Sequence, residues 1–579
     1  MSIAAFEKIF GTKPEFEIRA PGRTELGGNH TDHQHGRVLA APVNLYARAW
    51  VRRNGTKTVN VYSEGYEPFS TDISDTAIKP EEYGTTGSLV RGVAAAFAGY
   101  GTEGFDAYIT SDIPPGSGLS SSAALEILLG RIFCRLTGVK KTGEELAILG
   151  QYVENKYFGK PCGLMDQMAC AADGIITIDF KDPAKPVSES LFYDFKAAGY
   201  ELCIIKSGAG HENLTQNYAD ITVELGEICK LLGGEVLRDI PEEKFYQSIP
   251  QIRKACGDRA VLRAMHVYAD NKRVVDQVQA LKDNDIDKYL SLVNESGRSS
   301  WQLLQNVIPE GQSFHQEMAL ALAVARRSLG GRGAVRVHGG GFAGTIQAYV
   351  PVDMKEEFRA SVEAVLGADS CIFAHCLPDI VSVETMRKSD AWTIQNKIPS
   401  KELMKRAGEG IYQAGTWKAP VAVVCGKGNN AGDGYVVASL LREHGIDCRI
   451  ILTTDKFSED GKYYFDKCVE AGVPCEKYSE NTDLSSYSTI LDCLLGTGFQ
   501  GRVEGTLREV TEKINSSGAY VISADINSGL NGDTGEGSVF VKSDLTVSIG
   551  AFKLGHFNGM AREAMKEKVN CDIGIEIIE

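Results

Sequence analysis

A short segment rich in glycine and serine, PPGSGLSSSAALEILLG at Pro114–Gly130, leads directly into a run with helical periodicity. Small residues let a backbone approach a bulky anion closely, and the first helical turn leaves N–H groups unpaired with positive dipole character. This combination predicts a phosphate-binding loop. It is not a G-x-x-x-x-G-K-[ST] loop, because no Gly-Lys-Ser/Thr follows the glycines. A serine-capped helix after a Pro-Gly turn fits this segment, taken alone, equally well.

Length and composition bound the kind of protein. The 579 residues indicate about three structural units, and the net charge of −15 argues against nucleic acid or an anionic membrane as a partner. No apolar run approaches the ~20 residues of a membrane span, and the first residues lack a signal-peptide pattern. The fourteen cysteines form neither C-x-x-C nor a zinc-like spacing, which predicts reduced thiols. We therefore expect a cytoplasmic protein that acts on small molecules, and the oligomeric state stays open.

A polar segment lies between two strand-like runs near the N-terminus. The first run, Phe16–Ala20, is expected to end at Pro21-Gly22. Glycines interleaved with polar side chains favour a backbone held close to a polar ligand over a plain surface loop. The polar side chains of this segment are Arg23, Glu25, Asn29, His30, Asp32, His33 and His35. A metal site made by the three histidines is disfavoured, because their spacing fits no helix face.

Two further segments carry candidate chemistry. In QYVENKYFGKPCGLMDQ a helix breaks at Gly159 and Pro161, and Asp166 follows the turn. Asp166 fits a catalytic carboxylate and a helix N-cap equally well. The run VRVHGGGFAG at Val335–Gly344 feeds a strand, and its glycines fit either close packing against a nucleotide or phosphate loop or an ordinary turn.

These motifs in order, PGRTELGGNHTD, PPGSGLSSSAA, CGLMDQ, NESGRS and HGGGFAG, resemble the galactokinase branch of the GHMP sugar kinases. The resemblance covers roughly the first two-thirds of the chain, residues 1–383. It implies an α+β GHMP kinase fold with a phosphate-loop half at about 1–200 and a ferredoxin-like half at about 201–383. The active site is expected between these halves. The implied reaction is phosphorylation of the anomeric hydroxyl of a hexose, galactose first, with ATP and Mg²⁺.

The resemblance also assigns roles by position. Asp166 matches the acid that accepts the proton of the anomeric hydroxyl, and Arg23 matches the cation that faces this hydroxyl and the phosphoryl group. Ser122 and Glu154 match the magnesium ligands. The ATP loop comprises Gly116, Ser117, Gly118, Leu119, Ser120, Ser121 and Ser122. The sugar contacts comprise Glu25, Asn29, His30, Asp32, Gly163 and Tyr218. Phosphoryl transfer needs positioning and charge compensation, which such a set supplies.

Several positions depart from the family pattern. The family's usual glutamate before the histidine is Asn29 here, and its usual asparagine is Glu25. The usual Tyr-Asn-Asp/Glu is His33-Gln34-His35, and the usual threonine before the third glycine motif is His338. These changes leave a kinase for another sugar, such as an N-acetylated or acidic hexose, as the alternative. A sugar sensor without turnover is disfavoured because the serine loop, Arg23 and Asp166 are intact.

The last third begins a new pattern. VAVVCGKGNNAGDGYVVASLLREHGIDCRIIL reads as strand, glycine loop, helix and strand, and further parallel-type strands follow. This predicts a doubly wound, Rossmann-like three-layer α/β domain at 384–579. The loop matches the G-x-G-x-x-A dinucleotide fingerprint, but Asp455 lies too late to serve as its acid. Asp492 and Asp525 lie at strand ends, where open α/β sheets bind ligands.

The motifs GKGNNAGDG, LDCLLGTG, ADINSG with NGDTG, and SIGAFKLG resemble the NAD(P)H-hydrate epimerase domain. By position, Asp525 matches the catalytic aspartate, and Asn430, Asp492 and Ser528 match a potassium site. The implied contacts to hydrated NADH or NADPH are Gly428, Asn429, Asn430, Gly432, Asp433, Gly496, Gly498 and Asp525. Asn527 replaces the family's usual proline, so we expect a looser turn. This keeps a non-catalytic nucleotide-binding or sensor module as the alternative, and a dimer through this domain stays open.

Overall fold

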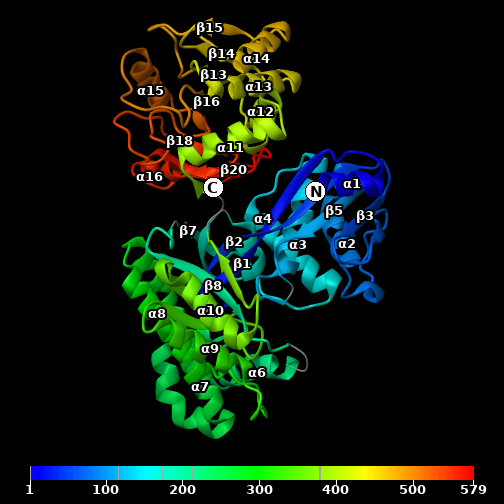
Figure 1. Ribbon diagram of the computed structural model, residues 1–579, viewed down its shortest axis with the longest axis vertical. Helices are drawn as coiled ribbons and strands as arrows, with labels where there is room; N and C mark the ends of the chain where they lie inside the picture. The colour runs from blue at the N-terminus through cyan, green and yellow to red at the C-terminus, as the bar shows by residue number, and fades with distance from the viewer. Residues whose placement is uncertain are drawn as a thin grey trace. The chain divides into compact units, whose positions relative to one another are not determined.

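The computed structural model describes residues 2–114, 116–172, 174–191, 193–210, 214–376 and 380–578. The chain forms two compact units, Met1–Leu377 and Pro378–Glu579 (Figure 1). Each hydrophobic cluster of the described residues lies within one of these units. Each unit therefore has a core of its own.

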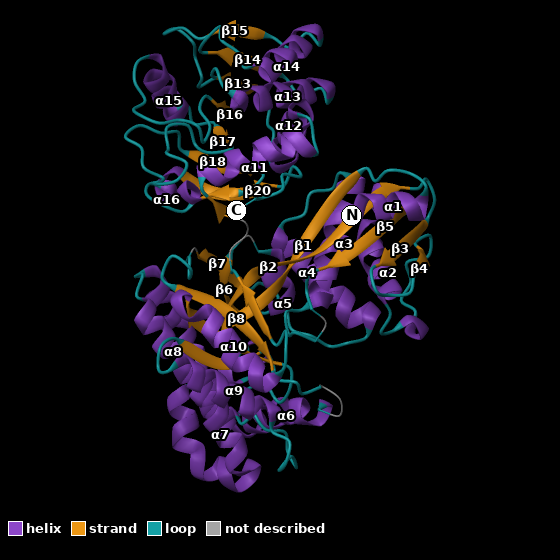
Figure 2. Cartoon of the chain, viewed as in Figure 1, coloured by secondary structure: helices purple, strands orange, loops and turns teal. Residues whose placement is uncertain are grey.

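The first part of the N-terminal unit is a seven-stranded sheet in the order β4-β3-β5-β2-β6-β7, with β1 paired to β2. β3 and β5 are parallel, and the other pairings are antiparallel. Helices lie beside this sheet (Figure 2). The strands are β1 (Phe16–Gly27), β2 (Arg37–Arg53), β3 (Thr58–Ser63), β4 (Phe69–Asp72), β5 (Phe105–Ser111), β6 (Ile175–Asp179) and β7 (Val187–Leu191). The helices are α1 (Ser2–Phe10), α2 (Thr86–Phe97), α3 (Ser121–Thr137), α4 (Gly143–Val153) and α5 (Met165–Ala171).

Strand β1 is longer than the sequence predicts. The expected end at Pro21-Gly22 is wrong, because β1 continues to Gly27 with register shifts on either side of Arg23–Glu25. The partner strand β2 is continuous over 17 residues, and the irregular register accommodates the proline that lacks an N–H. Arg23 and Glu25, expected in a loop, therefore lie on a strand.

Helix α3 follows the glycine and serine loop without a linker. Its inward face, which includes Ala124, Ile127 and Leu128, is fully buried in the core of this unit. The helix ends at Gly138, which has a left-handed conformation suited to glycine. Burial of this apolar face fixes the helix, and with it the loop at its N-terminus.

The second part of the N-terminal unit has an antiparallel four-stranded sheet in the order β11-β8-β10-β9. Its longest helix, α7, contains two helical segments that meet at Gly257, whose φ of 85° is not helical. The strands are β8 (Tyr200–Lys206), β9 (Ala334–His338), β10 (Thr345–Pro351) and β11 (Cys371–Ala374). The helices are α6 (Thr215–Leu232), α7 (Glu242–Lys282), α8 (Ile286–Ser299), α9 (Glu317–Leu329) and α10 (Lys355–Leu366).

The C-terminal unit is built on a seven-stranded parallel sheet in the order β15-β14-β13-β16-β17-β18-β20. The chain starts in the middle at β13, runs to one edge and returns to β16, which is doubly wound topology with its switch point between β13 and β16. The strands are β13 (Val421–Cys425), β14 (Cys448–Leu452), β15 (Cys475–Lys477), β16 (Thr489–Cys493), β17 (Tyr520–Ala524), β18 (Ser543–Ile549) and β20 (Met565–Cys571). A separate parallel pair joins β12 (Ile380–Val381) to β19 (Phe552–Lys553).

Helices flank this sheet (Figure 2). They are α11 (Val383–Asn396), α12 (Ser400–Ala414), α13 (Asn429–Glu443), α14 (Glu459–Glu470), α15 (Thr506–Ser516) and α16 (Ala561–Ala564). The five residues of β13 are all buried, as expected for a strand covered on both faces. The predicted three-layer α/β architecture is confirmed.

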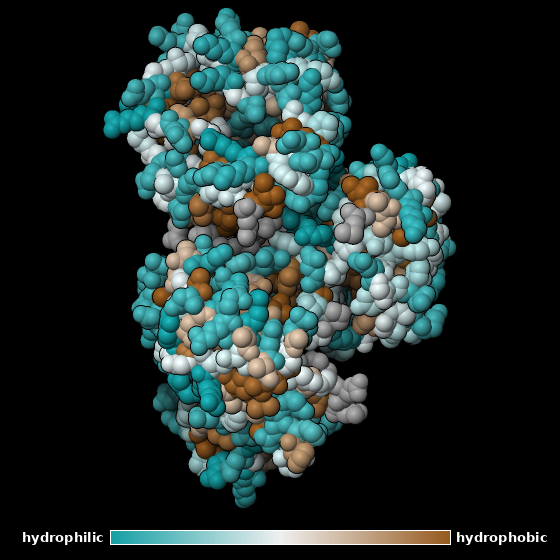
Figure 3. All heavy atoms as spheres, in the orientation of Figure 1, coloured by the Kyte–Doolittle hydropathy of each residue, from teal (hydrophilic) through white to brown (hydrophobic). Residues whose placement is uncertain are grey.

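The face of the molecule in Figure 3 is mostly hydrophilic, with apolar side chains scattered in small groups. Within the described residues, no helix is long and apolar enough to cross a membrane.

Candidate active sites of the two units

An ion pair between strand β1 and helix α5 lies at the centre of the N-terminal site. Arg23 Nε donates to Asp166 Oδ1 at 2.7 Å, and Arg23 Nη2 lies 2.7 Å from Asp166 Oδ2. Arg23 Nη1 donates to the carbonyl of Gly118, and Ser120 Oγ donates to the Asp166 carboxylate. Burial acts to lower the pKa of Arg23, but Asp166 outweighs it and raises that pKa. A charged guanidinium and a carboxylate thus meet at the loop.

The loop itself has the conformation that its glycines allow. Gly116 and Gly118 have φ values of 68° and 69°, and Ser120 adopts φ 54° although it carries a side chain. The hydroxyl of Ser117 is buried and has no hydrogen-bond partner within the described residues. Pro115, at the start of the sequence motif, lies outside the described residues.

The remaining loop residues connect the loop to strand β1 and helix α3. The Leu119 carbonyl accepts a hydrogen bond from the Arg23 backbone N–H at 2.9 Å. Ser121 and Ser122 form the first turn of α3, with Ser121 exposed and Ser122 half-buried. All seven residues predicted for ATP therefore lie in one turn or at the N-terminus of one helix, beside Arg23.

The two predicted magnesium ligands differ in burial, because Ser122 is half-buried and Glu154 is buried. Glu154 is buried, its Oε1 lies 3.2 Å from Lys160 Nζ, and its Oε2 accepts from Gln167 Nε2 at 2.8 Å. Gln167 Nε2 also donates to Glu126 Oε2 at 3.0 Å, and burial raises the pKa of Glu126 to about 9. No hydrogen bond or ion pair of the described residues links Ser122 with Glu154.

Three predicted sugar contacts hold three successive carbonyls of the glycine turn Gly339–Gly341. Asn29 Nδ2 donates to the Gly339 carbonyl at 2.6 Å, and His30 Nε2 lies 2.9 Å from the Gly340 carbonyl. The Tyr218 hydroxyl donates to the Gly341 carbonyl at 2.8 Å. In this structure these side chains thus contact protein atoms of the turn.

The orientation of His30 follows from its partners. Because the Gly340 carbonyl only accepts, His30 Nε2 carries the proton, and Nδ1 accepts from His33 Nε2 at 3.1 Å. His33 Nδ1 then accepts from Gln34 Nε2 at 3.3 Å. Burial, reinforced by His33, lowers the pKa of His30 to about 3, so the ring stays neutral.

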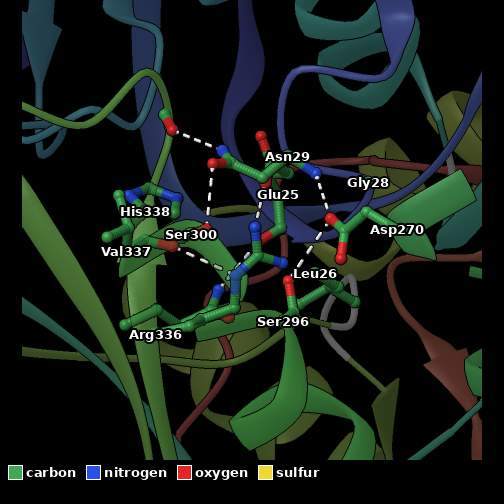
Figure 4. Close-up of polar contacts among 12 residues, drawn as sticks. Glu25, Leu26, Gly28, Asn29, Asp270, Ser296, Ser300, Arg336, Val337 and His338 are labelled. Carbon is green, nitrogen blue, oxygen red and sulfur yellow. Dashed lines mark hydrogen bonds and ion pairs between the residues drawn. The ribbon is translucent and has the colours of Figure 1, made fainter. Parts of the chain in front are cut away.

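Glu25 and Asn29, which exchange the family's usual residue types, touch each other (Figure 4). Asn29 Nδ2 lies 3.3 Å from Glu25 Oε1, and this carboxylate pairs with the fully buried Arg336. Burial raises the pKa of Glu25 to about 7, although Arg336 acts in the opposite direction. The Asn29 backbone N–H donates to Asp270 Oδ2 at 2.9 Å. The exchange therefore keeps one carboxylate and one amide in the same buried cluster.

Asp32 and Gly163 form the remaining predicted sugar contacts. A Cβ added to Gly163 would lie 2.8 Å from Asp32 Oδ2, so the carboxylate sits directly against this backbone. Asp32 is half-buried at the start of a short 3-10 helix, and Gly163 is exposed. This pair leaves the Asp32 carboxylate partly open to solvent.

In the C-terminal unit, Asp525 follows β17 and has the strained φ of 63°. Lys553 Nζ donates to Asp525 Oδ1 at 2.5 Å, Thr497 Oγ1 donates to Oδ2 at 3.0 Å, and His556 Nε2 donates to the Asp525 carbonyl at 2.7 Å. Burial would raise the pKa of Asp525, but Lys553 outweighs it and lowers that pKa. Asp525 is therefore an ionised carboxylate in a nearly buried setting.

Two other carboxyl groups near Asp525 have the opposite tendency. Burial, reinforced by Asp525, raises the pKa of Asp433 well above its ordinary range. Burial also raises the pKa of Asp390 to about 6. The site therefore combines a carboxyl group with a raised pKa, Asp433, and one with a lowered pKa, Asp525. Enzymes use carboxyl groups whose pKa values are shifted apart in this way as acid and base.

The other predicted contacts of this unit surround the switch point of the sheet. Gly428 and Asn429 are exposed at the start of α13, whereas Asn430, Gly432 and Asp433 are buried. A Cβ on Gly496 would lie 3.5 Å from Asp525 Oδ2 and 3.4 Å from Asn430 Cβ, so this glycine borders the aspartate. Gly498 follows two residues later on the same loop.

The predicted potassium ligands come from three elements: Asp492 from the end of β16, Ser528 from the turn after β17, and Asn430 from the first turn of α13. Asp492 is fully buried, and Ser528 Oγ donates to its Oδ1 at 2.6 Å. Asn430 Nδ2 donates to the carbonyls of Leu495 and Ala524 at 3.0 and 3.1 Å. The Asn430 Oδ1 atom is buried without a hydrogen-bond partner among the described residues. A buried oxygen without a donor, beside main-chain carbonyls, fits a monovalent cation in its donor chemistry.

The turn with Asn527 is held more firmly than expected. Asn527 is fully buried, and its Nδ2 lies 2.9 Å from the Val541 carbonyl, the Ala564 carbonyl and Ser543 Oγ. Thr546 Oγ1 donates to Asn527 Oδ1 at 2.5 Å. The expected loosening of the turn is therefore wrong, because these hydrogen bonds replace the rigidity of a proline ring.

Sequence reasoning missed several residues of the two sites. Lys553 lies in the quoted SIGAFKLG motif, and a lysine at the end of an apolar run was the signal that could have found it. Arg336 and Glu126 carry no such signal, because each resembles an ordinary surface residue of a strand or helix. Their buried partners are distant in the chain, Glu25 for Arg336 and Gln167 for Glu126.

Fold and site define the N-terminal unit as a GHMP-type phosphotransferase. The family model "GHMP kinases N terminal domain" matches residues 88–174, and "Galactokinase galactose-binding signature" matches residues 4–53. The galactokinase of Glaesserella parasuis serovar 5 is 31% identical over 369 residues, which is 62% of this chain and 91% of the relative. The chain belongs to the galactokinase family.

Two further comparisons extend this result. The galactokinase of Actinobacillus pleuropneumoniae is 32% identical over 363 residues, 61% of this chain and 90% of the relative. The crystal structure of Lactococcus lactis galactokinase complexed with galactose is 26% identical and covers 65% of this chain and 97% of that one, with a TM-score of 0.55. The model "YjeF-related protein N-terminus" matches residues 400–555, so the C-terminal unit carries an NAD(P)H-hydrate epimerase domain. Both resemblances are thus confirmed.

Proposed function

We propose that the N-terminal unit transfers the γ-phosphoryl group of ATP to the anomeric hydroxyl of galactose. The observation that carries this proposal is the Arg23–Asp166 ion pair, bound to the loop through Gly118 and Ser120. The galactokinase relatives, and the solved relative that binds galactose, support the choice of sugar.

The reaction follows from the charges of these residues. Asp166, held by two hydrogen bonds from Arg23 and one from Ser120, takes the proton of the anomeric hydroxyl. Arg23 offsets the charge that develops on the sugar oxygen and the transferred group. The loop backbone and the N-terminus of α3 bind the phosphates of ATP.

Magnesium belongs to this proposal, with Ser122 and Glu154 as its protein ligands. Mg²⁺ usually takes one or two carboxylates together with substrate phosphates, and Glu154 is a buried carboxylate. Within the described residues no group of three His, Cys, Asp or Glu side chains converges as a metal site, which fits an ion held largely by phosphate. When bound, the ion neutralises phosphate oxygens.

A kinase for another hexose is the second candidate, because Asn29, His30 and Tyr218 contact the glycine turn. A panel of hexoses with ATP and Mg²⁺ tests both candidates, with the phosphorylated position assigned by NMR. We expect galactose to give the highest kcat/KM and galactose 1-phosphate as the product. A higher kcat/KM for an N-acetylated or acidic hexose would favour the second candidate, and no turnover with any sugar would refute both.

We further propose that the C-terminal unit interconverts the epimers of hydrated NADH and NADPH. The supporting observation is the pair of carboxyl groups whose pKa values are shifted in opposite directions, lowered for Asp525 by Lys553 and raised for Asp433 by burial. The protonated group can donate to the leaving hydroxyl at the hydrated carbon. The ionised group can accept a proton when water adds to the other face. Gly496 borders Asp525 without a side chain of its own.

Potassium is part of this second proposal, with Asn430, Asp492 and Ser528 as the residues that would hold it. The buried and unpartnered Asn430 Oδ1 supports this choice. When bound, the ion supplies positive charge at the strand ends. Epimer interconversion, followed by chromatography of the two hydrates with and without protein, tests the activity. Equal rates with and without protein would leave only nucleotide binding.

We place both activities in the cytoplasm and assign them only small-molecule substrates. Within the described residues none of the fourteen cysteines forms a disulfide, which agrees with a reducing compartment. The net charge of −15 also disfavours nucleic acid as a partner.

A further inference from the structure

His338 occupies a central position between the two parts of the N-terminal site. It ends strand β9, is 2% exposed, and pairs in register with Thr345 of β10. Its Nδ1 lies 2.9 Å from Thr345 Oγ1, and its Nε2 lies 3.0 Å from Thr24 Oγ1. Thr24 is the neighbour of Arg23 on β1. The ring therefore bridges the strand of the catalytic arginine and the strand β10.

The direction of each hydrogen bond in this bridge is fixed by its ends. Thr345 Oγ1 donates its single proton to the Ser117 carbonyl at 3.1 Å, so it accepts from His338 Nδ1–H. At the other end, Gln347 Nε2 donates to Thr24 Oγ1 at 2.9 Å, and Thr24 Oγ1 donates to His338 Nε2. A neutral ring with its proton on Nδ1 gives both ring nitrogens and both threonine hydroxyls a partner in this chain of hydrogen bonds.

The surroundings keep the ring in this neutral state. Burial, reinforced by Arg23 and Arg336, lowers the pKa of His338 well below its ordinary range. The chain of hydrogen bonds ends on the phosphate loop, because Ser117 belongs to it. A Cβ on Gly118 would lie 2.9 Å from Thr345 Oγ1 and 3.2 Å from His338 Nδ1, so the loop packs directly on this pair.

We propose that His338 is a positioning residue for the phosphate loop, acting through Thr345 on the Ser117 carbonyl. The proposal rests on the kinase function given above. His338 replaces the threonine that the family usually has, and a threonine side chain is too short to reach both Thr24 and Thr345. The part of the ring that matters for ATP is Nδ1–H, because only this atom is linked to the loop. The Nε2 arm reaches Thr24 and fixes the ring.

Two substitutions separate the arms of the ring. An asparagine side chain places its amide nitrogen where Nδ1 of the ring lies, so it can still donate to Thr345. A glutamine side chain instead reaches the position of Nε2 and can hydrogen-bond to Thr24. We expect H338Q to raise the KM for ATP by about tenfold and H338N by less than about threefold, with kcat changed less than KM in both. T345V removes the Thr345 hydroxyl that links His338 to the Ser117 carbonyl, so its KM for ATP should match that of H338Q.

The double variant H338Q/T345V tests whether both residues act through one path. We expect its KM for ATP to equal that of T345V, because the path is already broken. Hydrogen exchange of the Gly118–Ser120 amides gives a readout that does not need turnover. Exchange should be faster in H338Q and T345V than in the wild type and H338N.

The outcomes separate the positioning role of His338 from the kinase function on which it rests. Equal KM and equal amide exchange for H338N and H338Q would refute the positioning role and leave His338 as a buried core residue. If the wild type phosphorylates no sugar, the kinase function fails, while amide exchange still decides the link to the loop. If the histidine variants lose the fold, as seen by circular dichroism, T345V alone decides through KM and exchange.

Discussion

At the scale of single residues, both sites place an aspartate in an ion pair with a basic side chain. Asp166 is held by Arg23, and Asp525 by Lys553. No ion pair of the described residues involves Asp433, and burial raises its pKa instead. The same side chain therefore serves as base or acid according to its neighbours.

The Asp166→Asn variant should lose kinase activity. An amide keeps the size of the side chain but cannot take the sugar proton, so we expect kcat to fall by about 10³-fold. Initial rates with galactose and ATP measure this, and ATP binding by calorimetry serves as the control for folding. A kcat within tenfold of the wild type would rule out Asp166 as the proton acceptor.

The Asp433→Asn variant should change both epimerase activity and the pH dependence of stability. In the folded wild type the pKa of Asp433 is raised. The stability that neutral Asp433 contributes is therefore fully present below the ordinary pKa of about 3.9, and it falls as the pH rises toward the folded pKa. Asparagine cannot ionise in the unfolded chain. The variant should therefore gain on the wild type by up to about 1.4 kcal/mol per pH unit in this window.

Urea denaturation of the full chain between about pH 5 and about pH 8, monitored in the C-terminal unit by hydrogen exchange, measures the Asp433→Asn effect. Epimerase activity should be lost at the same time, because the proton donor is gone. A stability difference that does not vary with pH would show that Asp433 is ionised in the folded protein.

At the scale of structural elements, turns and loops are fixed by close packing rather than by their own sequence. Gly116 and Gly118 share nearly the same φ, yet only Gly118 packs against Thr345 and His338. In the C-terminal unit, Asn527 holds a turn through its side-chain amide. The elements packed against a turn thus decide which side chains that turn can accommodate.

Gly118→Ala should weaken ATP binding more than Gly116→Ala. Both changes place a side chain at positive φ, which costs about 1–2 kcal/mol each. Only the Cβ at Gly118 meets an atom at 2.9 Å, whereas nothing lies within 4 Å at Gly116. We expect the KM for ATP to be about tenfold higher in Gly118→Ala than in Gly116→Ala. Equal KM values would show that the loop moves away from β10 without loss.

Asn527→Ala should destabilise the C-terminal unit by about 2–4 kcal/mol, because buried donors and acceptors lose their partners. Loss of epimerase activity with increasing urea reports this change. The matched control is Asn396→Ala, at an exposed residue with one hydrogen bond to the Trp392 carbonyl. It should shift stability by less than about 0.5 kcal/mol. Similar shifts for both variants would contradict a role for Asn527 in holding the turn.

At the scale of the whole molecule, two units with separate cores carry two unrelated chemistries. The substrates share no intermediate, since one reaction moves a phosphoryl group and the other inverts a hydrated carbon. A site built within one unit needs only the fold of that unit.

Asp166→Asn and Asp525→Asn in the full chain should therefore each abolish one activity and spare the other. Kinase and epimerase assays on the same preparation measure this, and the wild type assayed in parallel is the control. A loss of more than about threefold in the activity of the other unit would reveal coupling between them.

Much of the fold and of the two sites could be predicted from the chain itself. The order of glycine motifs, the loop before α3, the turn before α5 and the aspartate after a buried strand are local patterns, and they led to Arg23, Asp166 and Asp525 as candidates. Local patterns work here because binding loops recur between the same kinds of strand and helix. The long strand β1 was missed because pairing with β2 overrides a local Pro-Gly signal.

The sequence by itself determined the two families, the phosphate loop and the candidate acids, because these depend on residues close together in the chain. Only the tertiary structure decided how the polar residues near the sugar are used. Asn29, His30 and Tyr218 contact the glycine turn, and Glu25 pairs with Arg336, 311 positions away. It also decided the direction of the pKa shift of Asp433 and the orientation of His338. Burial and charge depend on partners brought together by folding, and no local pattern records them.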